Sequence, residues 1–128
     1  MNIQELNAYV VVFNGDKVLV LRRKNDLWEF PGGGIEWGEE PEEAAIRETK
    51  EETEIVVKEV KLIGVTSATF KKDGNDKHAI YLVYRAEANS DKVKISGEHS
   101  EHKWVSIGEL KELKLGLNAE RALAFIQR

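Results

Sequence analysis

Three glutamates in the middle of the chain have the type and spacing to hold a divalent cation. Glu48, Glu51 and Glu52 stand at positions i, i+3 and i+4, and a helix would place them on one stripe because each residue advances by about 100°. Like charges at these spacings destabilise an isolated helix by roughly 0.2 to 0.5 kcal/mol per pair. Two interpretations follow: a solvated acidic face, or a cage of hard oxygen ligands for Mg²⁺ or Mn²⁺.

A run of glycines just before these glutamates favours the second interpretation. Gly32, Gly33 and Gly34 follow Pro31, and a backbone without side chains turns sharply and approaches a ligand closely. Alone, such a run is more often only a turn. Beside three carboxylates, it can direct carbonyl oxygens or amides toward a complex of metal and phosphate.

The acidic residues are concentrated in one block. Between Glu36 and Glu54, nine glutamates stand against only two basic residues, Arg47 and Lys50. The whole chain has 19 Lys and Arg against 23 Asp and Glu, a formal net charge of −4 and a pI near 5.5. This balance argues against a general nucleic-acid binder, because such domains are normally basic.

Local patterns predict the elements before the acidic block. Residues 7–13 and 18–21 are rich in β-branched and apolar side chains and flank the turn dipeptide Asn14-Gly15, which predicts a β-hairpin. Residues 27–30 predict a third short strand, and we expect the glycines after it to form a loop.

The acidic block itself is predicted to be a helix. Pro41 suits a first helical turn, and the residues from Glu42 to about Thr53 are mostly good helix formers with no internal Gly or Pro. After it we expect strands over 55–65 and 79–86 around a polar turn at 71–76, a short strand over 103–105, a short helix over 107–113 and a final helix over 118–127 capped by Asn118.

Composition limits the class of protein. The 128 residues, with 41% hydrophobic and 33% charged residues, predict one globular domain over 1–128. The absence of cysteine excludes disulfides, thiolate zinc sites and cysteine nucleophiles. No apolar run approaches the roughly 18 residues of a membrane helix, and the N-terminus lacks signal-peptide features. We therefore expect a cytoplasmic protein that does not enter a membrane.

The chemistry-bearing residues also fit a known motif. The pattern G-x5-E-x7-R-E-U-x-E-E-x-G-U, in which U is aliphatic, falls on Gly33, Glu39, Arg47, Glu48, Thr49, Glu51, Glu52, Glu54 and Ile55. This segment resembles the Nudix box of the Nudix hydrolases, which cleave nucleoside diphosphates linked to another group. The flanking stretches 28–33 and 35–39 extend the resemblance. It implies an α+β fold, with a Nudix-type mixed β-sheet sandwiched between α-helices.

Two positions depart from the motif. Thr49 stands where an aliphatic residue is usual, and its hydroxyl can bond the Ala45 carbonyl. Glu54 replaces the usual glycine near the helix end, where a left-handed backbone would cost a non-glycine residue roughly 1 to 2 kcal/mol. Every charged position is intact, so we expect an active enzyme.

The resemblance implies a set of metal ligands. Glu48, Glu51 and Glu52 are the expected metal-binding carboxylates, joined by the Gly32 carbonyl and by Glu98. Glu98 is included because family members often draw a carboxylate from a loop before the last strand. The expected cofactor is Mg²⁺, for which Mn²⁺ can substitute.

The resemblance also implies catalytic roles. Glu48 doubles as the candidate general base, and Glu98 or Glu101 is the alternative. Arg47 is expected to support catalysis by orienting a helix glutamate through a salt bridge.

Three further residues are expected to bind substrate: Arg23, Gly33 and Glu39. The guanidinium fork of Arg23 matches phosphate oxygens. His99 and His102 are interpreted as polar residues of a loop or strand end, because a His-x-x-His pair without a third nearby soft ligand is a weak zinc signal.

These inferences predict an Mg²⁺-dependent pyrophosphohydrolase that cleaves a diphosphate linkage in a nucleoside triphosphate or related nucleotide, as MutT-like enzymes do. The alternatives are an ADP-ribose or diadenosine polyphosphate hydrolase and a non-catalytic nucleotide-sensing module. Residues 70–73 lack the proline and the tyrosine that mark the first two alternatives. The expected partner is a small-molecule nucleotide, with no nucleic-acid polymer and no membrane, and a homodimer stays open.

Overall fold

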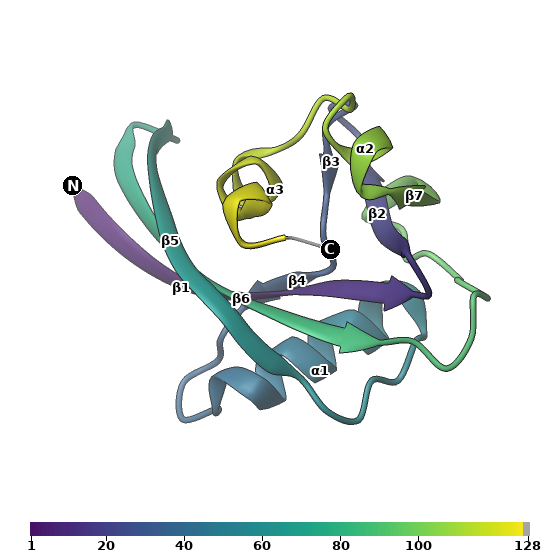
Figure 1. The fold of residues 1–128 in the computed structure, drawn as a ribbon. Coiled ribbons are helices and arrows are strands. Elements are labelled where there is room, and N and C mark those ends of the chain that lie inside the picture. The colour runs from purple at the N-terminus through teal and green to yellow at the C-terminus, as the bar shows by residue number, and fades with distance from the viewer. Residues whose placement is uncertain (127–128) are drawn as a thin grey trace.

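One mixed sheet organises the chain, as the computed structural model of residues 1–126 in Figure 1 shows. Its strands are β1 (Asn2–Asn14), β2 (Lys17–Arg23), β3 (Trp28–Glu29), β4 (Gly32–Gly34), β5 (Lys61–Lys72), β6 (Asn75–Glu87) and β7 (His99–Ser106). The helices are α1 (Pro41–Thr53), α2 (Ile107–Leu110) and α3 (Leu117–Ala122), and a 3₁₀ turn covers Leu123–Phe125.

Strand β1 is the centre of the sheet. The main order is β3-β2-β1-β6-β5, with β4 paired to β1 and β7 paired to β2. Strand β1 runs antiparallel to β2 and β4 but parallel to β6, from the pair Asn2–Asp76 to the pair Phe13–Glu87. The sheet is therefore mixed.

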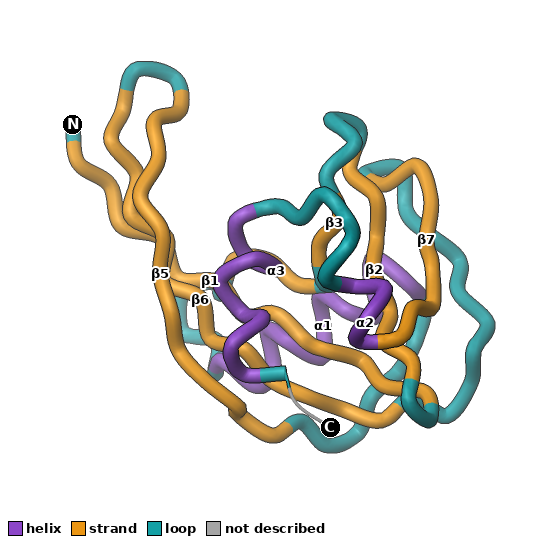
Figure 2. Tube along the Cα trace, turned by 45° about the horizontal axis from the view of Figure 1, so that its top comes forward, coloured by secondary structure: helices purple, strands orange, loops and turns teal. Residues whose placement is uncertain are grey.

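Helices cover both faces of this sheet because side chains alternate along β1. Val10 faces a cluster that includes Ala45 of α1, whereas Val11 faces the opposite cluster, which includes Ala119 of α3. All four side chains are fully buried. Figures 1 and 2 show α1 on one side of the sheet and α2 and α3 on the other. The predicted α+β sandwich is confirmed.

The predicted hairpin and the predicted acidic helix are confirmed with small changes. The turn at Asn14-Gly15 joins β1 to β2, although β1 begins earlier than expected, at Asn2. Helix α1 covers Pro41–Thr53, as the sequence predicts. The Thr49 hydroxyl donates to the Ala45 carbonyl at 2.8 Å, which is how a buried polar residue is accommodated there.

The strand predictions after α1 were wrong in their bounds. Residues 55–60 are not part of a strand, because Ile55 and Val57 are buried against the α1 side of the sheet without pairing. Strand β5 instead begins at Lys61 and continues to Lys72, so most of the polar segment 71–76 is also strand. The turn is reduced to Asp73 and Gly74, which both have positive φ, as a two-residue hairpin turn requires.

The glycine run and the final helices also differ from the predictions. Gly32–Gly34 is a short strand rather than a loop, because its backbone pairs with residues 7–9 of β1. The helix predicted over 107–113 ends at Leu110. The last helix is capped by Gly116 rather than Asn118 and ends at Ala122, and the predicted end at Gln127 lies outside the described residues.

The start of β1 and the hairpin of β5 and β6 extend together away from the helices, and we call these segments the arm (Figures 1 and 2).

Within residues 1–126, none of the helices is long and apolar enough to cross a membrane.

Candidate active site

A cavity of about 610 Å³ lies between the arm, the glycine strand β4 and the end of α1. Acidic, basic and aromatic side chains line it together, including Arg23, Glu29, Glu52, Phe70, Tyr81 and Glu98. Of the predicted site residues, it gathers Arg23, Gly32, Glu52 and Glu98.

Glu52 is the most buried acid of this cavity. Its exposed fraction is 6%, and its Oε1 accepts a hydrogen bond of 2.9 Å from the Gly32 N–H. Burial raises the pKa of Glu52 to about 8, and the charges of Glu29, Glu48 and Glu98 add to this effect. The site therefore disfavours a further negative charge unless a proton or a cation compensates it.

The glycines of β4 bring this strand close to α1. A Cβ atom on Gly32 would collide with the carbonyl oxygen of Ala8 in the neighbouring strand, and Gly32 has a φ of 151°. A Cβ atom on Gly33 would lie 2.9 Å from the carboxyl carbon of Glu48. Glycine at position 32 lets β4 lie close against β1, and glycine at position 33 lets the Glu48 carboxylate approach β4.

Glu48 lies one turn before Glu52 on α1. Burial raises the pKa of the Glu48 carboxyl, although the neighbouring Arg47 guanidinium acts in the opposite direction. A half-buried carboxylate with a raised pKa is better suited to accept a proton from water than an exposed one.

Arg47 connects the helix acids to the preceding loop. Its guanidinium donates to both carboxylate oxygens of Glu39, at 2.8 and 3.0 Å, and to Glu48 at 2.9 Å. It also donates to Glu51 at 3.3 Å and to the Gly34 carbonyl at 3.1 Å. This network gives Arg47 the geometry to orient the helix glutamates, which is the role expected of it.

Glu39 and Glu51 lie apart from the cavity lining. The hydrogen bond from Arg47, together with the one from the Glu36 N–H, lowers the pKa of Glu39 to about 2. Both oxygens of Glu39 are thus engaged in holding the loop. The Glu51 side chain is 57% exposed and faces Arg47.

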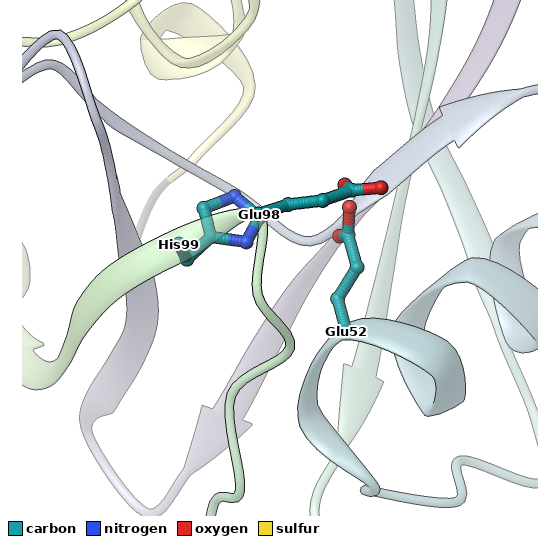
Figure 3. Close-up of side chains that lie close together, drawn as sticks. All are labelled: Glu52, Glu98 and His99. Carbon is teal, nitrogen blue, oxygen red and sulfur yellow. The ribbon is translucent and has the colours of Figure 1, made fainter.

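The two candidate acids near β7 have different surroundings. Ligand atoms of Glu98, Glu52 and His99 all lie within 4.8 Å of one another, and Figure 3 shows the two carboxylates meeting. Glu101 lies opposite Arg22 and forms an ion pair with it at 3.2 Å. Glu98 is therefore placed at the cavity, and Glu101 is engaged elsewhere.

Three cavity residues were missed as site residues: Glu29, His99 and Asn118. His99 Nε2 lies 2.8 Å from Glu29 Oε2, and the Asn118 amide donates to Glu29 Oε1 at 3.0 Å. Glu29 is the polar member of the alternation in residues 27–30, which was the one available signal. Asn118 was interpreted as a helix cap, and His99 as a polar residue of a loop or strand end.

The geometry of carboxylates beside a glycine strand agrees with the match to a family model, the NUDIX domain, over residues 4–126. The chain belongs to the NUDIX domain family. The predicted resemblance is thereby confirmed, and so is the predicted class of enzyme, a hydrolase that acts on pyrophosphate bonds.

Individual relatives agree with this membership. An "ADP-ribose pyrophosphatase" of Methanocaldococcus jannaschii is 30% identical over 80% of this chain, which spans 62% of the relative's length. A "MutT-like protein" of Streptomyces ambofaciens is 33% identical over 91% of this chain and 72% of its own length. A MutT NUDIX hydrolase structure from Burkholderia pseudomallei has the same fold, with a TM-score of 0.84 at 22% identity over 98% of this chain and 99% of its own.

Nudix hydrolases generally use a divalent metal, and the donors at this cavity fit one. Glu52 and Glu98 in the cavity lining, and Glu48 beside Gly33 of the glycine strand, offer carboxylate oxygens, the hard ligands that Mg²⁺ and Mn²⁺ prefer. Burial first, and then the charges of Glu29, Glu48 and Glu98, raise the pKa of Glu52, and a bound cation would offset both effects.

Proposed function

We propose that this Nudix domain is an Mg²⁺-dependent pyrophosphohydrolase that cleaves a diphosphate linkage in a nucleoside triphosphate or a related nucleotide, with Mn²⁺ as a substitute. The observation that carries the proposal is the meeting of Glu52 and Glu98 in a cavity of about 610 Å³ beside the glycine strand. A polyphosphate would be repelled from such a place unless a cation lay between the two sets of negative charge.

The proposed metal ligands are Glu48, Glu52 and Glu98, together with the Gly32 carbonyl. Glu51 is the remaining proposed ligand; its side chain is exposed beside Arg47. A divalent cation bound there would neutralise phosphate charge and make a water molecule more acidic.

The side chains of the cavity have roles that follow from their positions. Glu48 is the proposed general base, because its pKa is raised and it lies one helical turn from Glu52. Glu98 is the alternative base, and the ion pair of Glu101 with Arg22 makes Glu101 the weakest of the three candidates. The base accepts a proton from the water that attacks phosphorus.

Arg23, which lines the cavity, is the proposed phosphate contact. Its side chain is 44% exposed and its Nε lies 3.9 Å from Glu29, so the guanidinium keeps donors free for phosphate oxygens. Phe70 and Tyr81 also line the cavity and offer aromatic faces on which a base can stack. We propose supporting roles for Gly33 and Glu39, which shape the site without lining the cavity.

The proposal also covers the domain organisation, the partner and the location of the chain. The match over residues 4–126 supports one domain over 1–128. A small nucleotide as the partner follows from the acidic cavity, and the absence of cysteine is compatible with a cytoplasmic protein. The archaeal relative supports ADP-ribose as a second candidate substrate, and the composition of residues 70–73 does not favour it over a triphosphate.

A substrate panel with Glu52→Gln as the inactive control tests this function. The panel contains nucleoside triphosphates, ADP-ribose, dinucleoside polyphosphates and nucleotide sugars with Mg²⁺, and products are identified by mass. We expect pyrophosphate and a monophosphate from a triphosphate, whereas AMP and ribose phosphate would indicate the ADP-ribose route.

Two variants, Glu52→Gln and Glu59→Gln, test whether the assigned site carries out the hydrolysis. Glu52→Gln removes a ligand and a charge while keeping the shape, so turnover should fall by orders of magnitude with the fold intact. The exposed Glu59 lies outside the cavity lining, and Glu59→Gln should keep the activity of the unmodified protein. Full turnover by Glu52→Gln would refute the assignment.

A further inference from the structure

The imidazole of His99 is held in one orientation by the half-buried carboxylate of Glu29. Its side chain is 1% exposed, and its Nε2 lies 2.8 Å from Glu29 Oε2. The second oxygen of Glu29 accepts a hydrogen bond from the Asn118 amide, so both oxygens act as acceptors. In the neutral tautomer that carries its hydrogen on Nε2, this hydrogen faces Glu29 and Nδ1 has a free lone pair.

That lone pair lacks a hydrogen-bond partner anywhere in residues 1–126. A buried acceptor without a partner is unfavourable, because it has lost its contact with water and gained nothing in exchange. The ring lies beside the carboxylates of Glu52 and Glu98, as Figure 3 shows, and a nitrogen of the ring is within 4.8 Å of an oxygen of each. In this tautomer the imidazole and the two carboxylates offer electron pairs within one small volume, and a cation is a partner that they can share.

The local fold directs His99 to this place. The pairing of β2 with β7 shifts register between Arg22, which faces Glu101, and Arg23, which faces His99. One extra residue, Ser100, is thus inserted in β7. Such a bulge turns the side chains of a strand and is frequent beside active sites.

We propose that His99 Nδ1 is a metal ligand that joins Glu52 and Glu98 in a mixed nitrogen and oxygen site for a first-row transition cation such as Co²⁺ or Mn²⁺. The inference rests on the proposed function, because Glu52 and Glu98 are ligands in both. It adds a nitrogen ligand that the motif does not contain, and with it a preference among cations.

The surroundings of His99 match the second layer of a metal centre. A ligating histidine usually donates its other ring N–H to a carboxylate, which fixes its tautomer and raises its basicity. Glu29 of β3 supplies that carboxylate, and Asn118 of α3 in turn orients Glu29. Imidazole nitrogen binds Co²⁺ better than it binds Mg²⁺, which prefers oxygen and retains its water. Loss of His99 should therefore affect the two cations unequally.

Cation binding by the full chain without nucleotide tests this inference, with titration calorimetry of Co²⁺ and Mg²⁺ separately. We expect His99→Gln to weaken Co²⁺ binding by at least about 10- to 100-fold, because even the loss of an outer-shell partner of a ligand costs a metal centre this much. Mg²⁺ affinity should change by less than about twofold, because an oxygen-binding ion gains little from the imidazole. His102→Gln, a change in the neighbouring histidine of β7, should leave both affinities unchanged.

Proton NMR of the Co²⁺-bound protein gives a direct readout of the bond. The Nε2 hydrogen is shielded by Glu29 and should give a strongly shifted exchangeable resonance in the unmodified protein and in His102→Gln, but none in His99→Gln. Absence of this resonance from the unmodified protein, or an equal loss of Co²⁺ and Mg²⁺ affinity in His99→Gln, would overturn the inference. Failure of the unmodified protein to bind either cation would instead contradict the proposed function as well.

Discussion

The ionised form of the Glu52 carboxylate is strongly disfavoured in the folded protein. Burial and three neighbouring acids raise its pKa from 4.5 to about 8, and the hydrogen bond from Gly32 offsets only part of this effect. In the metal-free protein, the folded chain therefore binds a proton at neutral pH that the unfolded chain has already released.

This difference predicts how metal-free stability depends on pH. The contribution of Glu52 is fully present below about pH 4.5 and is lost as pH rises toward 8, because the unfolded chain ionises first. Glu52→Gln cannot ionise, so in a chelating buffer at pH 8 it should melt above the unmodified protein, by roughly 2 to 8 °C for each kcal/mol removed. Melting curves from pH 5 to 8 check this expectation, and a constant difference between the two proteins across that range would contradict it.

Sequence reasoning identified the residues of the motif but not their supporting contacts. Glu48, Glu52 and Arg47 could be named because a local helix fixes their relative positions. The partners of Glu29 could not, since His99 and Asn118 lie 70 and 89 positions away from it in the chain. No spacing rule connects such residues, because a bulge and the packing of α3 decide their contacts.

At the scale of elements, the end of α1 shows how the chain departs from its motif. Glu54 has a φ of 62°, in the left-handed region, and its N–H bonds the Lys50 carbonyl at 2.9 Å. The usual glycine would adopt this conformation freely, so Glu54 holds it at a cost. The left-handed residue nevertheless ends the helix, and the next residue, Ile55, is buried against the sheet.

Glu54→Gly should consequently stabilise the protein. Relief of the left-handed strain should raise the free energy of unfolding by about 1 kcal/mol, measured by urea denaturation. The exposed pair with Lys94, at 3.9 Å, contributes little to stability. Glu54→Ala loses the same ion pair but keeps the strain, so it should not be stabilised. Equal effects of the two substitutions would show that the conformation at residue 54 carries no cost.

Elements with a periodic side-chain pattern were predictable, and elements defined by backbone pairing were not. Helix α1 and the first hairpin follow from helix formers, β-branched residues and a turn dipeptide. Strand β4 consists only of glycine, which is depleted in strands. Its pairing with β1 depends on the return of the chain to the sheet centre, which local sequence does not encode.

At the scale of the whole molecule, the cavity exists because elements from both sides of the sheet meet beside the central strand β1. Helix α1 supplies Glu52 from one face, α3 supplies Asn118 from the other, and the arm supplies Phe70. The long parallel pairing of β1 with β6 holds the arm against the rest of the sheet. Glu52 of the acidic block therefore lines the same cavity as the basic residues Arg23, Lys71 and Lys72.

The central claim is that these acids hold a divalent cation, and melting of the protein with and without millimolar Mg²⁺ or Mn²⁺ tests it most directly. A cation that binds only the folded state stabilises it, by about 2.7 kcal/mol at a concentration 100 times the Kd. The melting temperature of the unmodified protein and of Glu59→Gln should rise with cation concentration, and that of Glu52→Gln should rise much less. An unmodified protein that melts at the same temperature with and without cations would contradict the account.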